Sequence, residues 1–468
     1  MSPPQATGAG TVRQPTRRNT ELGLLILGFA IGTYALFNTT WATGSTGVSS
    51  ELWIALAVLS IVGVLGHLAV RRWAPYAEPI MLPTAYLLNF LGLVMIYRLD
   101  IAEAQRASEN GSPEPTPAVQ GQLMWTIVGI LLLALTFIVV KDHRKLQRYT
   151  YISLVLGVIL LLLPLAPGIG KTINGATLWI SIGGLTFQPA ELAKIVLTVF
   201  LAGYLVTKKE SLAIVRTRVL GIPMPRPRDL GPLLLGWLLA LAVIAFEQEI
   251  GTAVIFFGLF ITLLYIATQR RGWLILGLAL AILGTVLAYV AFAHVRTRFE
   301  IWLDPFQYAS DQGYQIVQSL YGLANGGVLG TGWGQGYPQL VPFANSDFIL
   351  ASFGEELGLT GLMAILLLFA ILVERGYRTA VACRDVFGRL LAAGLATVFA
   401  LQIFVVAGGV TKLIPMTGLT TPFMSAGGSA LIANWLMVGL LLRISDVTRR
   451  PDPLVSSPDD QLTSVARL

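Results

Sequence analysis

The chain has 468 residues, of which 55% are hydrophobic and 12% are charged, and its mean hydropathy is +0.71. This composition excludes an ordinary soluble protein and indicates a membrane protein with several spans. The single cysteine, Cys383, excludes a disulfide framework, and the three histidines lack zinc-binding spacing, so we expect any metal ion to be held by carboxylates.

A membrane-spanning helix needs about 20 predominantly apolar residues. By this measure the sequence predicts an all-α protein with about twelve transmembrane helices. They lie at 22–39, 52–70, 80–98, 122–140, 150–166, 188–206, 230–246, 250–268, 272–292, 349–373, 387–409 and 423–442. We expect 230–246 and 250–268 to form a tight helical hairpin. Residues 1–21, which lack a signal-peptide pattern, and 446–468 are expected to be disordered tails.

The basic residues follow the predicted topology. With a cytoplasmic N-terminus, the cytoplasmic segments contain 25 of the 32 Lys and Arg residues and the outer loops contain 6. The positive-inside rule then places both termini in the cytoplasm and the large loop 294–348 outside the cell. The net charge of +7 reflects this topology, so we do not expect a nucleic-acid partner. The basic segment 207–229 is expected to lie on the inner leaflet or to dock a partner.

The loop 294–348 ends at the most informative carboxylate of the chain. A loop of this length is functional or disordered, and its aromatic residues favour an ordered loop. Its glycines lack the Gly-Lys-Ser/Thr ending of a phosphate-binding loop. Asp347 stands at the mouth of the next span and must face water, a charge or a substrate. We therefore take Asp347 as the candidate catalytic residue; helix capping, with help from Ser346, is the alternative.

Two groups of charges are candidates for binding an anion. Glu191 and Lys194 are three residues apart and share a helix face. They form either a buried ion pair that stabilises helix packing or a phosphate site with an orienting carboxylate. Arg296 and Arg298 lie in the outer loop, where arginines are scarce, and would bind an anion or lipid headgroups.

Further polar residues lie in three conspicuous stretches. The segment "GYQIVQSLYGLA" has helical spacing and carries Gln315, Gln318 and Ser319. Ser425 belongs to a stretch of small residues that permits close helix approach or irregular backbone around a cavity. Trp179 and Gln188 flank the start of the helix that carries Lys194.

Taken in order, four blocks of sequence resemble the SEDS family (shape, elongation, division and sporulation), which contains the RodA and FtsW proteins. The blocks are "NGATLWI…QPAELAK", "RTRFEIWLDP…DQGYQIVQS", "NSDFILASFGEELGLTG" and "PMTGLTTPFMSAGGSA". Glu249 stands where the family usually has Asp. The resemblance covers about 80–445 and implies a ten-helix core, preceded by two extra helices within 22–79. Such an extension is similar to that of actinobacterial RodA-type members.

The resemblance implies a peptidoglycan glycosyltransferase in the bacterial cytoplasmic membrane that polymerises lipid II during cell elongation, with a class B penicillin-binding protein as partner. Asp347 would take the proton of the acceptor 4-hydroxyl, and undecaprenyl pyrophosphate would leave. Lys194, Arg296 and Arg298, or a divalent cation such as Mg²⁺ or Mn²⁺, would receive the pyrophosphate charge. No organic cofactor is expected.

The resemblance also implies a set of substrate-binding residues. The set is Lys194, Glu191, Arg296, Arg298, Trp179, Gln188, Gln315, Gln318, Ser319 and Ser425. Two other functions stay open: a flippase that moves lipid II across the membrane, using the same charges as a relay, and a non-catalytic scaffold that recruits a transpeptidase.

Overall fold

The computed structural model describes residues 16–44, 50–113, 115–173, 176–213, 217–219, 222–224, 238, 241–242 and 249–451. Within these ranges, eleven helices are long and apolar enough to cross a membrane. The predicted all-α membrane fold is confirmed. The predicted span 230–246, and with it the tight hairpin, lies almost entirely outside the described residues.

The spans follow the hydrophobic segments of the sequence closely. Their bounds are α1 (Arg18–Ala42), α2 (Ser50–Trp73), α3 (Met81–Glu109), α4 (Ala118–Val139), α5 (Thr150–Leu162) between the short helices η1 (His143–Tyr149) and η2 (Leu163–Leu165), α6 (Pro189–Ala213), α8 (Ile250–Thr268), α9 (Gly272–Ala291), α12 (Ile349–Ala382), α13 (Val386–Val410) and α14 (Gly428–Arg449). Pro189 begins α6, as its missing N–H at a first helical position allows.

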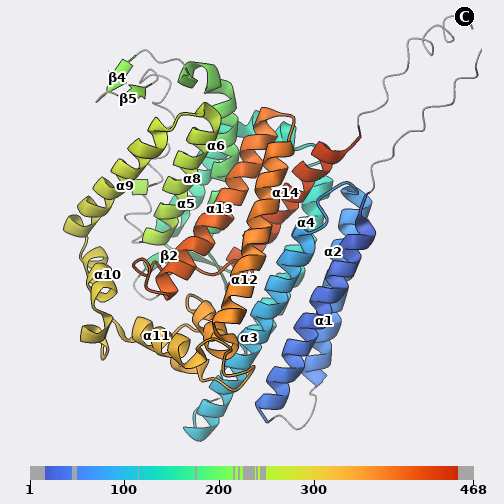
Figure 1. The fold of residues 1–468 in the computed structure, drawn as a ribbon, viewed down its shortest axis with the longest axis vertical. Coiled ribbons are helices and arrows are strands. Elements are labelled where there is room, and N and C mark those ends of the chain that lie inside the picture. The colour runs from blue at the N-terminus through green and yellow to red at the C-terminus, as the bar shows by residue number, and fades with distance from the viewer. Residues whose placement is uncertain are drawn as a thin grey trace, which may run out of the picture.

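The bundle has a packed centre and two thinner edges (Figure 1). Helices α3, α6, α13 and α14 are mostly buried, and α14 packs on α4 and α6. On one edge α1 packs on α3, and α2 packs on α4. On the opposite edge α9 is almost wholly exposed and contacts the bundle through α8 and α10. Such a surface suits lipid, because α9 is apolar all round.

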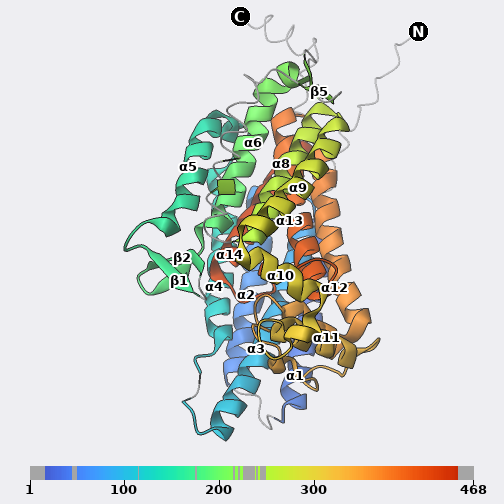
Figure 2. The same cartoon turned by 90° about the vertical axis from the view of Figure 1, so that its left-hand side faces the viewer.

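The loop 294–348 is an ordered set of short helices at one end of the bundle (Figures 1 and 2). They are α10 (Ala293–Leu303), η3 (Pro305–Tyr308), α11 (Tyr314–Gly326) and η4 (Pro338–Leu340). The predicted helix over "GYQIVQSLYGLA" is thereby confirmed.

Two small antiparallel sheets were not expected from the sequence. Strands β1 (Gly170–Ile173), β2 (Ala176–Ile182) and β3 (Leu185–Phe187) pair in chain order between α5 and α6, and β4 (Thr217–Val219) pairs with β5 (Ile222–Met224) beyond α6. The second of these lies within the basic segment 207–229.

The predicted tails are too long at both ends of the chain. Helix α1 begins at Arg18, and Glu21 is fully buried beside Arg18 and 2.8 Å from His67. Helix α14 continues to Arg449, and the buried Asp446 pairs with Arg443 at 3.2 Å. In the sequence Glu21 and Asp446 resemble residues of a polar tail. In the structure both are buried, because each is paired with an oppositely charged side chain. The start of α1 and the end of α14 lie at the same end of the bundle (Figure 2).

A buried ion pair joins α3 to the only break inside α12 that the described residues show. Gly358 has φ 67°, which interrupts the helix, and the segment 327–337 fills the gap. Thr331 N and Gly332 N donate to the carbonyls of Glu355 and Glu356 at 3.0 and 2.9 Å. Arg98 then donates to the buried Glu356 carboxylate at 3.0 Å. This pair fixes the outer segment on the bundle.

We expect Arg98→Ala to destabilise the protein by about 3–5 kcal/mol, because it leaves the Glu356 carboxylate buried without its cation. Arg378→Ala is the matched control, since Arg378 pairs with Glu374 on the surface and its loss costs no more than about 1 kcal/mol. Thermal unfolding of the purified protein in detergent measures both changes. Equal losses of stability would show that the Arg98 pair has no special role.

Candidate functional site

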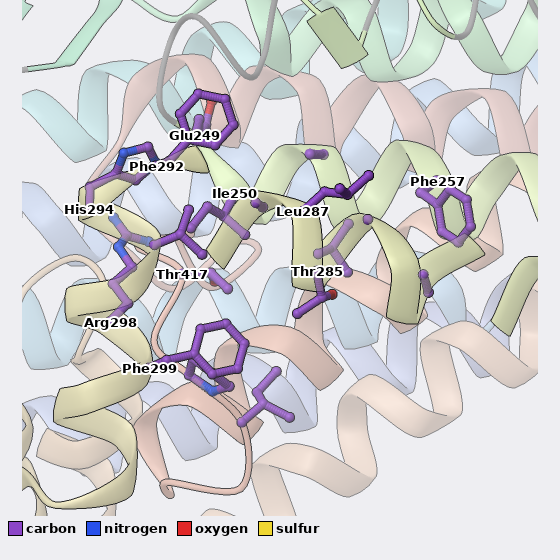
Figure 3. Close-up of a pocket in the computed structure, with 18 of the residues that line it drawn as sticks. Glu249, Ile250, Phe257, Thr285, Leu287, Phe292, His294, Arg298, Phe299 and Thr417 are labelled. Atoms are coloured by element: carbon purple, nitrogen blue, oxygen red, sulfur yellow. The ribbon is translucent and has the colours of Figure 1, made fainter. Parts of the chain in front are cut away.

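A groove with a cavity volume of about 580 Å³ opens between α8, α9, α10 and the segment 414–417 (Figure 3). Its walls are almost entirely apolar. Polar side chains gather at one end, where α10 meets the groove: Glu249, His294, Arg298 and Thr417. The groove therefore suits a long apolar molecule that carries a charged group at one end.

The spacing of small residues on α9 explains the width of the groove. The residues of α9 that line the groove include Ala281, Gly284, Ala288 and Ala291, which recur at helical spacing on one face. A Cβ placed on Gly284 would meet nothing within 4 Å. Because these side chains are short, α9 lies beside α8 and leaves space for a guest.

Arg298 connects the groove to Asp347. Its Nη1 donates to the carbonyl of Met416 at 3.1 Å, which docks α10 on the turn before Gly418. A Cβ built on Gly418 would lie 3.6 Å from Asp347 Oδ2 and 3.9 Å from Arg298 Nη2. Gly418 has φ +79°, so this close approach depends on glycine. Asp347, Arg298 and Gly418 thus form one cluster at the polar end of the groove.

The electrostatics of the cluster favour proton transfer. Burial raises the pKa of Asp347 above its usual range, while a hydrogen bond with Ser346 and the charge of Arg298 oppose the shift. Burial likewise raises the pKa of Glu249, which accepts a hydrogen bond of 2.6 Å from Thr252. Burial, followed by the charge of Arg298, lowers the pKa of His294. A carboxylate with a raised pKa is a stronger base, so Asp347 is suited to accept a proton.

Ser425 holds the backbone beside Asp347. Its buried hydroxyl donates to the carbonyl of Ser346 at 2.6 Å and accepts from Thr421 N at 2.8 Å. Next to it, Ala426 N donates to the carbonyl of Asn345 at 2.7 Å. The Ser425 hydroxyl thus has a donor and an acceptor inside the protein, and its predicted substrate contact stays a prediction.

Lys194 is also buried inside the protein. Its ammonium lies 2.8 Å from Glu191 and donates to Gln402 at 3.0 Å, and its side chain has no exposed surface. Gln402 in turn donates to the carbonyl of Thr420 at 2.9 Å. In this structure Lys194 and Glu191 therefore form the buried ion pair of the packing alternative, and the phosphate site stays a prediction. The pair supports the segment that contains Gly418.

Gln188 has a similar supporting role. Its buried amide donates to both oxygens of Glu249 at 3.3 and 3.4 Å. It therefore orients a carboxylate of the groove and is not itself open to a ligand. From the sequence, Glu249 was not predicted to be a site residue; it only differed from the Asp that is usual at this position. An acidic residue directly before a long apolar run is the signal that could have identified it.

The remaining predicted residues do not join the cluster. Arg296 is exposed, donates to the carbonyl of Val290 at 3.4 Å and lies 5.9 Å from the centre of the Tyr289 ring. Ser319 is fully buried and donates to the carbonyl of Val410 at 3.3 Å, and its predicted substrate contact stays a prediction. Three others are partly buried and do not line the groove: Gln315, Gln318 and Trp179.

Residues 79–450 match the sequence model of the FtsW/RodA/SpoVE family, described as a cell cycle protein. The peptidoglycan glycosyltransferase RodA of Mycobacterium tuberculosis is 47% identical over 449 residues, which cover 96% of this chain and 94% of the relative. A probable peptidoglycan glycosyltransferase FtsW of Geobacter metallireducens is 33% identical over 371 residues, 78% of this chain and 94% of the relative.

A solved structure is similar in fold. It belongs to a peptidoglycan synthase complex that coordinates polymerization and crosslinking, and it matches with a TM-score of 0.55 at 24% identity. The match covers 85% of this chain and 98% of the solved chain. At this identity the likeness shows a shared arrangement of helices.

We expect Asp347→Asn to stabilise the protein at neutral pH. Since the pKa of Asp347 is higher in the folded protein than the value of about 3.9 in an unfolded chain, the folded state binds this proton more tightly. The protonated Asp347 side chain therefore adds to the free energy of unfolding when the pH is below its pKa in the unfolded chain. This contribution is lost as the pH rises through the pKa of Asp347 in the folded protein. Melting temperatures measured from mildly acidic to neutral pH should show a gain for the variant that shrinks on acidification.

The control is Glu109→Gln, which changes an exposed carboxylate at the end of α3. It should leave the melting temperature unchanged across the same range. A lower melting temperature for Asp347→Asn at neutral pH would contradict the electrostatic account of the cluster.

Proposed function

The chain belongs to the FtsW/RodA/SpoVE family, and from this membership we propose that it is a peptidoglycan glycosyltransferase that polymerises lipid II during cell elongation. The RodA relative matches nearly the whole chain, including the region of α1 and α2. The FtsW relative matches 371 residues, about the length of the family segment 79–450. The full-length match favours elongation over division.

The observation that carries the proposal is the groove that leads from the lipid-facing helix α9 to Arg298, which lies beside Gly418 together with Asp347. An undecaprenyl chain is apolar and long, and a pyrophosphate at its end needs a cation. The apolar walls would hold the part of the chain next to the head group. Arg298, at the polar end, would contact the pyrophosphate, a role that the sequence had divided among three cations.

In the proposed reaction the acceptor 4-hydroxyl attacks the anomeric carbon of the donor sugar. Asp347 takes the hydroxyl proton as the new bond forms, and the bond from the anomeric carbon to the pyrophosphate oxygen breaks with inversion. The charge that develops on the pyrophosphate is stabilised by Arg298.

A divalent cation would accompany the pyrophosphate instead of residing on the protein. Among the described residues, the His, Cys, Asp and Glu side chains form no group of three at Asp347 that could hold a metal ion. The proposed reaction therefore needs no protein-bound Mg²⁺ or Mn²⁺ ion at Asp347.

We propose the orientation given by the basic residues, with both termini in the cytoplasm and α10, α11 and Asp347 toward the outer face. Lipid II polymerisation at that face would then be coupled to crosslinking by a class B penicillin-binding protein. The solved relative that coordinates polymerization and crosslinking supports such a partner.

We expect Asp347→Asn to lower the rate of glycan polymerisation by about 10²–10⁴-fold, the usual contribution of a general base. The assay uses purified protein with a class B penicillin-binding protein and lipid II, and separates the glycan products on a gel. Glu109→Gln should retain full activity. We expect Asp347→Asn to remain folded. Its melting temperature and its binding of lipid II are therefore measured in parallel, so that a loss of activity can be distinguished from a loss of structure.

The other outcomes distinguish the alternative functions. A lipid II flippase would move lipid II across vesicle membranes without making polymer. A scaffold would make no polymer with either residue at 347, and Asp347→Asn would be harmless in cells. Polymer formation that is unaffected by the substitution would overturn the assignment of Asp347.

The groove itself is tested by Gly284→Leu, because Gly284 lines the cavity and a Cβ built on it would meet nothing within 4 Å. Displacing about two methylene groups of a polyprenyl chain, at about 0.8 kcal/mol each, should lower kcat/KM for lipid II about tenfold. A lipid II analogue with a short tail should lose less. Gly23→Leu, on the exposed face of α1, is the matched control. Equal losses for both tail lengths would exclude the groove as the polyprenyl site.

A further inference from the structure

A second cluster of reactive side chains lies at the other end of α12 from Asp347. His143 begins η1, Cys383 follows the last residue of α12, and Asp385 caps the first turn of α13. His143 Nε2 lies 2.9 Å and Cys383 Sγ lies 3.3 Å from Asp385 Oδ2. All three ligand atoms lie within 4.8 Å of one another. The cluster and Asp347 lie at opposite ends of α12, a helix about 50 Å long.

The three ligand atoms converge on one point above Gly388. A Cβ built on this glycine would lie 2.3 Å from His143 Nε2, 2.7 Å from Cys383 Sγ and 2.9 Å from Asp385 Oδ2. Zinc binds nitrogen at about 2.0–2.1 Å and sulfur at about 2.3 Å in a tetrahedral arrangement, which places ligand atoms about 3.3–3.7 Å apart. The two separations from Asp385 Oδ2, 2.9 and 3.3 Å, would widen by only a few tenths of an ångström. The absence of a side chain at Gly388 leaves room beside the converging atoms.

The three proposed ligand atoms hydrogen-bond to one another, so a metal ion would replace these bonds. Asp385 Oδ1 is occupied by Gly388 N at 2.6 Å, so Oδ2 is the available ligand. His143 is fully buried, and its Nδ1 has no hydrogen-bond partner among the described residues. Asp142 Oδ1 lies 3.9 Å from that nitrogen. When Nε2 binds a metal, Nδ1 carries the ring proton and faces this carboxylate, the usual outer arrangement of a metal-bound histidine.

We propose that His143, Cys383 and Asp385 bind one Zn²⁺ ion, with water as the fourth ligand. A thiolate, an imidazole and a carboxylate together favour zinc over Mg²⁺ or Ca²⁺, which prefer oxygen ligands. On binding, the Cys383 thiol releases its proton to solvent and gives up its hydrogen bond to Asp385. The exposed Arg144, whose Nε lies 3.6 Å from Asp385 Oδ2, swings away. The ion would then clamp the connection between α4 and α5 to the turn between α12 and α13.

The sequence alone conceals this site, because His143 and Asp385 are 242 residues apart. Two of the three proposed ligands are a histidine and a cysteine, whereas the sequence led us to expect carboxylates around any metal ion. The site lies at the end of the bundle that holds the start of α1 and the end of α14, which the basic residues place in the cytoplasm. It is independent of the proposed glycan synthesis.

The test uses the full chain in detergent, with any affinity tag removed. Because Cys383 is the only cysteine in the sequence, every thiol signal reports this site. We expect one Zn²⁺ per chain after dialysis, slower alkylation of Cys383 by a maleimide in the presence of Zn²⁺, and recovery of the alkylation rate with a chelator. Cobalt(II) should give a thiolate charge-transfer band.

Three variants identify the ligands. Cys383→Ser and Asp385→Asn should each weaken zinc binding more than about tenfold, and Asn retains the capping bond to Gly388. Asp142→Asn, a neighbouring carboxylate outside the ligand set, should retain the stoichiometry and lose less affinity. Wild-type protein without stoichiometric zinc, or zinc binding that survives Cys383→Ser unchanged, would overturn the proposal and leave the cluster as a hydrogen-bonded helix cap.

Discussion

A charge that is removed from water inside a membrane protein must be matched by a partner. This constraint determines how the helices of the bundle pack around their charged side chains. Across the described residues, the buried charges are satisfied by the protein itself. Arg98 meets Glu356, Lys194 meets Glu191 and Gln402, and Arg443 meets Asp446. The contrast lies at the end of the groove. In the part of the chain that the structure describes, Asp347 and Arg298 lie close together, yet neither forms an ion pair within 4.0 Å. The proposed function assigns these two charges to the ligand.

The same constraint explains which polar residues could be placed from the sequence. Asp347 could be found from its position, because a carboxylate at the mouth of a span needs a partner. Lys194, Ser319 and Ser425 were assigned to substrate because they are polar residues in motifs, but a sequence does not show whether a polar group is already satisfied. Burial and hydrogen bonds make all three structural, and two of them support the Asp347 cluster through the segment 420–426. Glu249 was missed as a site residue, although it lines the groove.

Hydropathy predicted the membrane-spanning helices well, because a long run of apolar residues is nearly sufficient to form a helix that faces lipid or is buried in the bundle. It failed where a few polar residues control the geometry. Helix α14 begins at Gly428 and not at 423, because the backbone from 420 to 426 is held against the Asp347 segment by Ser425. Ser346 does not cap α12: the N-cap position is Phe348, without a side-chain hydrogen bond. The hairpin of β1 and β2 lacks a strong hydrophobic alternation, so its residues appeared to be a loop.

The size of the groove bears on how a polymerase could release its carrier. A cavity of about 580 Å³ is typical of a pocket for a drug-sized molecule, and an undecaprenyl chain is much longer. The protein would therefore enclose only the part of the chain near the pyrophosphate and leave the rest in the bilayer. Since α9 is almost wholly exposed and joins the bundle mainly through α8 and α10, the groove is bounded on one side by a single helix. The spent carrier would then leave sideways into lipid, without a large apolar surface passing through water, while the glycan stays near Asp347 for the next addition.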